Sequence, residues 1–177
     1  TLTDKELFDS AVHFLLNFQG ITKNNLEKQL LSEYKKPLDL GIIYKKMCES
    51  AQNRQMSSKV IGNAIGGISN LKEILFNFDP HLVAKRFSIK DSKSLLSDIK
   101  TKLKPKGQIR TTKRSLWPQY CQSVIDSAHF LSSFKSAEEF YVWADFFFFF
   151  IRARPSLTLL ISLEITGFGF PLACDFL

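Results

Sequence analysis

Apolar residues recur every three or four positions along most of the chain, which is the spacing of one face of an α-helix. The first such stripe follows Thr3 to Glu6, a segment with the form of a capping box, and contains Leu7, Ala11, Phe14, Leu15 and Phe18. Further stripes predict helices over residues 24–34, 38–52, 57–68, 70–76, 92–103, 115–131, 137–150 and 157–165, and one that starts at Asp79-Pro80. No alternating run predicts a pair of strands. We therefore expect an all-α fold of about ten short helices.

The composition is that of a folded domain. The 177 residues are 45% hydrophobic and 23% charged, and they include seventeen Phe but only eight Gly and six Pro, which excludes disorder and collagen-like repeats. Cys48, Cys121 and Cys174 are odd in number and lack CxxC spacing. They argue against a disulfide framework or a zinc site and favour a reducing, cytoplasmic environment. The three His are scattered over different predicted helices, so no metal site is expected.

The longest aromatic run does not predict a membrane segment. Phe146 to Phe150, followed by Ile151, lies between Asp145 and Arg152 and is far shorter than the roughly 20 apolar residues that span a bilayer. Five consecutive helical residues cover every side of a helix. The sequence thus predicts either a helix buried all round or a helix with some rings facing a cleft or a partner.

One segment carries the whole excess of positive charge. The chain has 24 basic and 17 acidic residues, for a net charge of +7. Residues 100–114 hold no acidic residue and seven basic ones, namely Lys100, Lys102, Lys104, Lys106, Arg110, Lys113 and Arg114. This concentration favours an anionic partner that is met at one place, although a solvated basic loop is the alternative. Pro105 and Gly107 interrupt the segment, which predicts a linker between an N-terminal lobe (1–105) and a C-terminal lobe (106–177) with a cleft between them.

The most informative pattern lies in residues 163–177, LEITGFGFPLACDFL. An apolar helix is followed by Gly167-Phe168-Gly169, and Pro171 suits the first turn of the next helix. Two glycines around one apolar residue allow a tight turn whose backbone N–H groups no side chain obstructs. With the start of the following helix, these amides predict a site for nucleic-acid phosphates. We expect Phe168 to fold inward and to hold the two helices together.

This segment resembles the hairpin of the helix-hairpin-helix DNA glycosylase superfamily, which has the form Leu-x-Gly-apolar-Gly-x-x-x-Ala. Residues 166–173 match its Gly-apolar-Gly and the Ala that follows, and Thr166 stands where the family usually has Pro. A looser similarity extends over residues 56–177. It includes a small-residue helix before Asn77 to Pro80, and Ile109-Arg110 ahead of the segment 123–143, in the order of methyladenine glycosylases. Residues 1–55 carry no motif.

The resemblance implies a protein of base-excision repair that binds double-stranded DNA and hydrolyses N-glycosidic bonds. It implies a DNA-binding surface made of the turn and the basic segment, with the residues Gly167, Phe168, Gly169, Phe170, Lys104, Lys106, Arg110, Lys113 and Arg114. It implies no metal centre and no cofactor, other than a monovalent cation that the carbonyl groups of the turn can hold. The amides would contact a phosphate either directly or through that cation.

Two departures from the family pattern bear on the chemistry. The family's catalytic Asp lies beyond the second hairpin helix, and the present sequence stops inside that helix, with Asp175 too close to the turn for the role. Pro171 stands where lyase-competent members have a nucleophilic Lys, so Schiff-base chemistry is not expected. Two alternatives stay open: a non-catalytic DNA-binding module, and a helical protein-interaction domain in which the hairpin is a packing turn. The sequence indicates neither the substrate base nor the oligomeric state.

Overall fold

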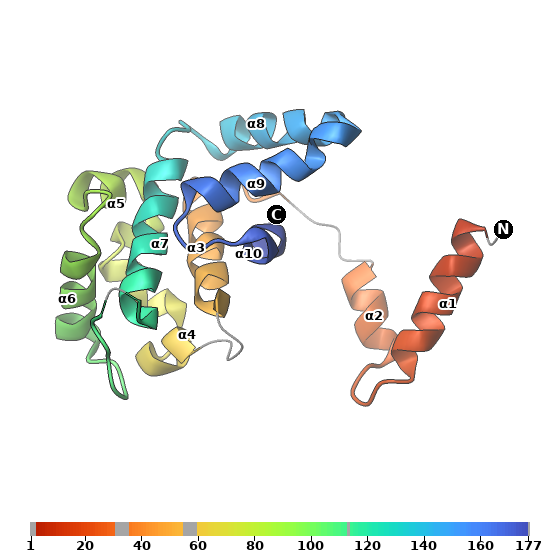
Figure 1. Cartoon of the computed structure of the whole chain (residues 1–177), viewed down its shortest axis with the longest axis horizontal. Coiled ribbons are helices and arrows are strands. Elements are labelled where there is room, and N and C mark those ends of the chain that lie inside the picture. The colour runs from red at the N-terminus through yellow and green to blue at the C-terminus, as the bar shows by residue number, and fades with distance from the viewer. Residues whose placement is uncertain (1–2, 31–35, 55–59, 113, 177) are drawn as a thin grey trace. The chain divides into compact units, whose positions relative to one another are not determined.

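The computed structural model of the protein describes residues 3–30, 36–54, 60–112 and 114–176. Within these ranges the chain forms ten α-helices and four short 3-10 helices, and it contains no strand (Figure 1). The predicted all-α class is therefore confirmed. The residues group into two compact units, Thr1–Lys36 and Pro37–Leu177.

The first unit contains the helices α1 (Asp4–Leu16) and α2 (Lys23–Leu30). The predicted capping box is present at the start of α1. The Glu6 N–H donates to Thr3 Oγ1 at 3.3 Å, and the Thr3 N–H donates to Glu6 Oε2 at 2.7 Å. The bond from the Thr3 backbone lowers the pKa of the Glu6 carboxyl group. None of the α1 residues is buried, so its apolar stripe is left on the surface of this unit.

The second unit is built around α7 (Leu116–Leu131), of which ten of the 16 residues are buried. Helices α3 (Leu40–Ala51), α5 (Pro80–Arg86) and α6 (Ser92–Leu103) pack directly against it (Figure 1). The hydroxyl of Tyr44 in α3 donates to the carbonyl oxygen of Val124 in α7 at 3.0 Å. The full burial of Tyr44 raises its pKa well above the usual range, so the phenol keeps its proton and remains a donor. This bond ties two central helices together inside the core.

The remaining elements surround these four helices. They are η1 (Gln52–Arg54), α4 (Val60–Ile65), η2 (Ile68–Glu73), η3 (Phe76–Phe78), α8 (Ala137–Phe149), η4 (Ile151–Ala153), α9 (Arg154–Glu164) and α10 (Phe170–Phe176). The helix expected over residues 70–76 is replaced by η2, which starts earlier because Gly67 adopts a left-handed backbone with φ +117°. Asn70 lies inside η2, and its side chain donates to the Ile65 carbonyl oxygen at 2.7 Å.

The predicted boundary at residues 105/106 does not coincide with the division between the two units. Helices α5 and α6, which precede that boundary, pack against α7, which follows it, and α10 packs against α3. Residues on both sides of the boundary therefore share one hydrophobic core. The basic segment is a connection inside this unit, and the Lys106 N–H donates to the Ala64 carbonyl oxygen at 2.8 Å.

The aromatic run is not buried all round, which excludes the first of its two expected arrangements. Phe140 and Ala144 form the buried face of α8, whereas Phe146 is 61% exposed and Phe149 is 83% exposed. In the part of the chain that the structure describes, no single helix is both long and apolar enough to cross a membrane. Helix α8 and the segment Ile151–Glu164 meet that criterion only together, with a bend of 109° between them.

Asp79 and Asp91, which directly precede α5 and α6, differ in their bonds, which gives a matched test. Asp79 Oδ1 accepts from the N–H groups of His81 and Leu82 at 2.9 and 3.1 Å. Asp91 precedes α6 but bonds to the hydroxyl of Ser94 rather than to a helix amide. We expect Asp79→Ala to lower the free energy of unfolding by about 1–2 kcal/mol and Asp91→Ala by less. Urea denaturation checks this, and equal losses for the two variants would contradict it.

Candidate functional site

At the turn between α9 and α10, two predicted features are present, a glycine-dependent backbone at Gly167 and an inward Phe168, whereas the fold itself does not require glycine at position 169. Gly167 adopts φ +82°, a left-handed value that is strained for residues with a side chain. Phe168 is only 1% exposed, so its predicted inward orientation is confirmed. The Phe168 N–H donates to the Ile165 carbonyl oxygen at 3.0 Å and closes the turn. The ring of Phe168 and the side chain of Ile165 thereby anchor the turn in the hydrophobic core.

Gly169 differs from Gly167 in what the fold requires of it. Its φ lies outside the left-handed region, and a Cβ atom built on it would meet only Pro171 Cδ, at an ordinary contact distance of 3.7 Å. A side chain at position 169 therefore fits the protein itself. Such a side chain would occupy the space outside the turn, through which a ligand would reach the backbone.

Three backbone amides of the turn make no hydrogen bond inside the described part of the protein. The N–H groups of Gly167, Gly169 and Phe170 have no acceptor within the residues that the structure describes. Gly169 and Phe170 are exposed, and the first bond of α10 runs from the Ala173 N–H to the Gly169 carbonyl oxygen at 3.1 Å. A backbone N–H group without an internal acceptor takes its partner from water or from a ligand.

Two buried side chains of α7 hold the backbone of the turn in place. The Thr166 N–H donates to Asp126 Oδ2 at 3.0 Å, and the Ser123 hydroxyl donates to the Thr166 carbonyl oxygen. Gln122 Nε2 donates to Asp126 Oδ1 at 2.7 Å and thus orients the carboxylate. Our sequence analysis did not identify these residues. The available signal was the set of polar residues on a helix face that is otherwise apolar, at Ser123, Asp126 and Ser127.

The basic segment presents its side chains to solvent. Pro105 and Ile109 are partly buried and anchor it, and the Ser115 hydroxyl donates to the Arg110 carbonyl oxygen at 2.8 Å. Lys113 lies outside the described residues. The other predicted contacts of this segment are all exposed, and none of them takes part in an ion pair within the described ranges; they are Lys104, Lys106, Arg110 and Arg114.

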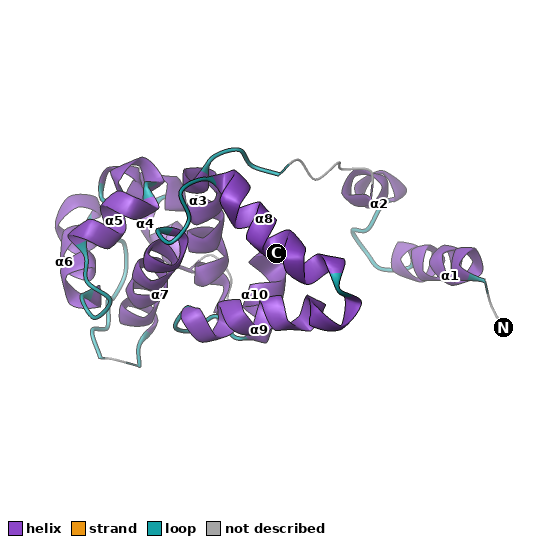
Figure 2. Ribbon diagram, turned by 90° about the horizontal axis from the view of Figure 1, so that it is seen from above, coloured by secondary structure: helices purple, strands orange, loops and turns teal. Residues whose placement is uncertain are grey.

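The basic segment and the α9–α10 turn both contact α7, but they lie at different positions along it and do not form one cluster. The basic segment leads into Ser115 at the start of α7, whereas Ser123 and Asp126, which hold the turn, follow 8 and 11 residues later. At the rise of an α-helix this separation is about 12–17 Å along the axis. Figure 2 shows the segment and the α9–α10 turn on the same side of the unit.

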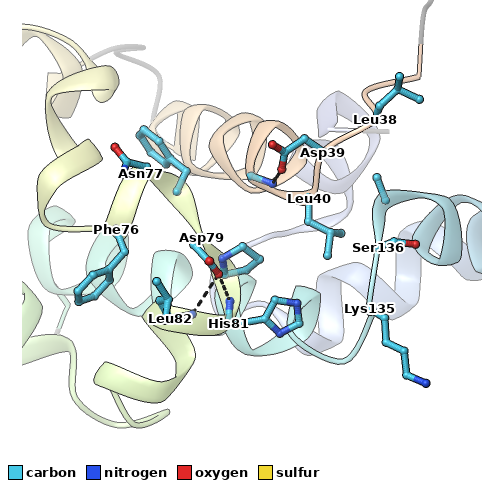
Figure 3. A pocket seen from close by; sticks show the side chains of 14 residues that line it. Leu38, Asp39, Leu40, Phe76, Asn77, Asp79, His81, Leu82, Lys135 and Ser136 are labelled. Carbon is cyan, nitrogen blue, oxygen red and sulfur yellow. Dashed lines mark hydrogen bonds between the residues drawn. The ribbon is translucent and has the colours of Figure 1, made fainter.

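A pocket of about 660 Å³ lies elsewhere, where the starts of α3, α5 and α8 meet (Figure 3). Its volume is typical of small-ligand sites. Its acidic side chains already serve helix ends, because Asp39 Oδ1 accepts from the Gly41 N–H at 2.6 Å and Asp79 Oδ1 caps α5. Ser136 likewise caps α8. None of the residues that we predicted for the site lines this pocket.

The cysteines and histidines do not form a reactive centre in the described part of the chain. No group of three or more His, Cys, Asp or Glu side chains there could hold a metal ion. Burial raises the pKa of the Cys48 and Cys121 thiols far above the usual range, so both stay protonated and unreactive. His129 Nε2 lies 2.8 Å from the Phe87 carbonyl oxygen, which gives it a structural partner.

Comparison with known proteins does not identify a family for this chain. No family model matches it, and no curated protein or solved structure does so either. Its function is therefore inferred from its own residues, above all from the α9–α10 turn and the exposed basic segment.

Removal of the carboxylate that holds the turn should destabilise the protein. Asp126→Ala leaves the Thr166 N–H without its acceptor in a partly buried place, and Gln122 Nε2 keeps only its bond to the Ile89 carbonyl oxygen, so we expect a loss of about 1–3 kcal/mol in the free energy of unfolding. Ser133→Ala is the control, because the Ser133 hydroxyl makes an exposed bond near the end of the same helix. Urea denaturation of both variants checks the prediction, and a loss no larger than that of the control would contradict it.

Proposed function

We propose that the protein binds double-stranded DNA with the α9–α10 turn acting as a helix-hairpin-helix element. The observation that carries the proposal is the group of three backbone N–H donors, at Gly167, Gly169 and Phe170, that lack an acceptor among the described residues. Ser123 and Asp126 hold the turn from α7, so the donors are fixed before a ligand arrives. Such amides suit phosphate oxygens, which are the same in every sequence, and so they would position the duplex rather than read its bases.

The basic segment supports the same proposal from a second place. Four of its cations are exposed and lack ion-pair partners in the described ranges, namely Lys104, Lys106, Arg110 and Arg114. The distance of about 12–17 Å along α7 between the segment and the braces of the turn is less than the ~34 Å length of one turn of duplex. One DNA molecule could therefore contact both features. Neutralised phosphates would release counterions, so affinity should fall steeply as salt rises.

For the reaction, we propose hydrolysis of an N-glycosidic bond without lyase chemistry, in keeping with the resemblance of residues 163–177 to the DNA glycosylase hairpin. Pro171 has no amine that could form a Schiff base at the position where lyases carry Lys. We assign the hydrolytic step to no residue of this chain. Binding of DNA by the turn is the part of the proposal that its residues support directly.

A bulky residue at position 169 should separate binding from folding. We expect Gly169→Leu to keep the stability of the parent, since the fold leaves room there, but to weaken DNA binding at least about tenfold by blocking the backbone. Phe168→Ala should instead act on folding, because it removes a buried ring, and should lower the free energy of unfolding by about 3–5 kcal/mol. Thermal unfolding and fluorescence anisotropy with a labelled duplex measure the two effects.

Ser133→Leu is the matched control, because it adds the same side chain at another exposed position of the unit. A Gly169→Leu protein that is folded and binds DNA as well as the parent would show that the turn only packs two helices. The helical interaction domain would then be the better description of the protein.

Replacement of the basic side chains should change the salt dependence of binding. We expect the combined variant Lys104→Ala, Lys106→Ala, Arg110→Ala and Lys113→Ala to weaken binding equally for all duplex sequences. Each lost phosphate contact should reduce the slope of log K against log salt by about 0.9. The control removes Lys85, Lys90 and Lys93, which are exposed elsewhere in the same unit. Titrations between low and moderate salt check this, and an unchanged slope would identify the segment as a solvated loop.

A further inference from the structure

The corner between α8 and α9 carries a group of large apolar side chains that the described residues of the second unit leave exposed. Phe149 is 83% exposed, Ile151 76%, Phe146 61% and Phe150 51%. The ring centroids of Phe146 and Phe150 lie 5.5 Å apart, and those of Phe149 and Phe150 lie 5.3 Å apart, so the rings form one continuous patch. These four residues and Phe148, which is also exposed, are called the apolar corner below.

The apolar corner projects from one end of the second unit. Helix α8 and the segment Ile151–Glu164 meet there with a bend of 109°, and Phe150 leaves the helical conformation with φ −101° and ψ 109°. The corner lies at the opposite end of the unit from α5 and α6 (Figure 1; Figure 2). A projecting end can enter another phase while the helices behind it stay in water.

The rings of the apolar corner point in several directions. Successive residues of an α-helix are about 100° apart, so Phe146 and Phe148 point about 160° away from each other and Phe149 lies between them. Phe150 and Ile151 then follow at the end of the helix. A flat protein surface would cover only part of so wide an arc, whereas fluid lipid chains can surround all of it.

The charged residues next to the corner are mainly basic. Residues 146–163 include no acidic residue and two basic ones, Arg152 and Arg154, which are both exposed, and Asp145 precedes this stretch. Arg154 Nε donates to the Phe148 carbonyl oxygen at 3.1 Å, which places the guanidinium group beside the end of α8. Arginine binds phosphate through several N–H groups, and its apolar stem can lie along hydrocarbon. Rings flanked by arginines therefore match the two layers of an anionic membrane surface, hydrocarbon and phosphate.

The area of the apolar corner is large for a surface that stays in water. Aromatic side chains present about 150–250 Å² when fully exposed, so the exposed fractions of the five residues amount to roughly 500–600 Å². This is the upper end of the apolar patches found on single soluble chains, and such patches mark interaction sites. The shape of the corner and its arginines favour lipid as the partner.

We propose that the apolar corner is a membrane-docking site, which inserts its rings into the outer part of a bilayer that contains anionic phospholipids. Arg152 and Arg154 then lie at the level of the lipid phosphates. Such a contact reaches only about 5–10 Å into the bilayer and does not cross it. The proposal does not depend on DNA binding, because the corner shares no residue with the α9–α10 turn or with the basic segment.

The first test is co-sedimentation of the whole chain, residues 1–177, with vesicles made of equal parts phosphatidylcholine and phosphatidylserine. We expect Ile151→Ser to weaken binding about tenfold or more, because it removes an apolar side chain that the bilayer would bury. Ile89→Ser is the matched control, since it removes the same exposed side chain at the opposite end of the unit. Arg152→Gln should weaken binding about fivefold, and only when the vesicles contain phosphatidylserine. Circular dichroism shows whether each variant keeps its helices.

The second test reads which part of the molecule enters the bilayer. In Phe149→Trp, the fluorescence that the new indole adds to that of the parent should shift to shorter wavelength when the same vesicles are added. Lipids with brominated chains should quench it, because bromine quenches only fluorophores that lie among the chains. Ile89→Trp is the control and should keep the emission of an indole in water. This readout separates docking by the corner from attraction of the basic segment to the vesicle surface.

Several results would overturn the proposal. One is a parent chain that does not bind the vesicles, and another is an Ile151→Ser variant that binds them as well as Ile89→Ser does. Binding without a shift for Phe149→Trp would assign the contact to the basic segment. Emission from Phe149→Trp that is already at short wavelength before vesicles are added would show that protein covers the corner. Equal binding of Arg152→Gln and the parent would contradict the contact with lipid phosphates.

Discussion

Two side chains of a central helix fix the backbone of Thr166, and the candidate site depends on this contact. Ser123 and Asp126 lie on buried positions of α7, where a polar group without a partner would be costly. The N–H and C=O groups of Thr166 supply those partners. The turn that follows returns to the core at Phe168 and is exposed at Gly169 and Phe170. The buried polar side chains of α7 and the backbone of Thr166 thus supply one another's hydrogen-bond partners.

The features that the sequence predicted well are those decided within a few residues. Thr3, Asp79 and Ser136 accept bonds from amides two or three positions ahead, so their roles follow from local spacing. The inward Phe168 and the left-handed Gly167 belong to the same class. What could not be predicted depends on partners far along the chain. Asp126 bonds to a residue 40 positions away. Helices α5 and α6 pack on α7 although the basic segment separates them in sequence, so the two compact units meet at residues 36/37 and not at 105/106.

Local signals also failed where two of them competed. Asn70 is of a residue type that often caps helices, but η2 already begins at Ile68, directly after Gly67 with its positive φ. The side-chain amide of Asn70 donates to the Ile65 carbonyl oxygen instead. Phe76, Asn77 and Phe78 all adopt positive φ, which only Asn among them tolerates readily. Only Phe78 of the three is buried, so the conformation runs against the preference of the two Phe residues. The exposed rings of α8 have a similar origin, since a run of five Phe covers every side of a helix and the core meets only one.

The two glycines of the α9–α10 turn answer to different demands. Gly167 is required by its own backbone conformation, whereas Gly169 has room for a side chain and would be required only by something that approaches from outside. If the turn binds DNA as proposed, descendants of this chain that no longer bind it could accept larger residues at position 169 while still keeping glycine at position 167. The residue at position 169 would then indicate whether DNA binding is retained, whereas the glycine at position 167 would indicate only that the protein still folds.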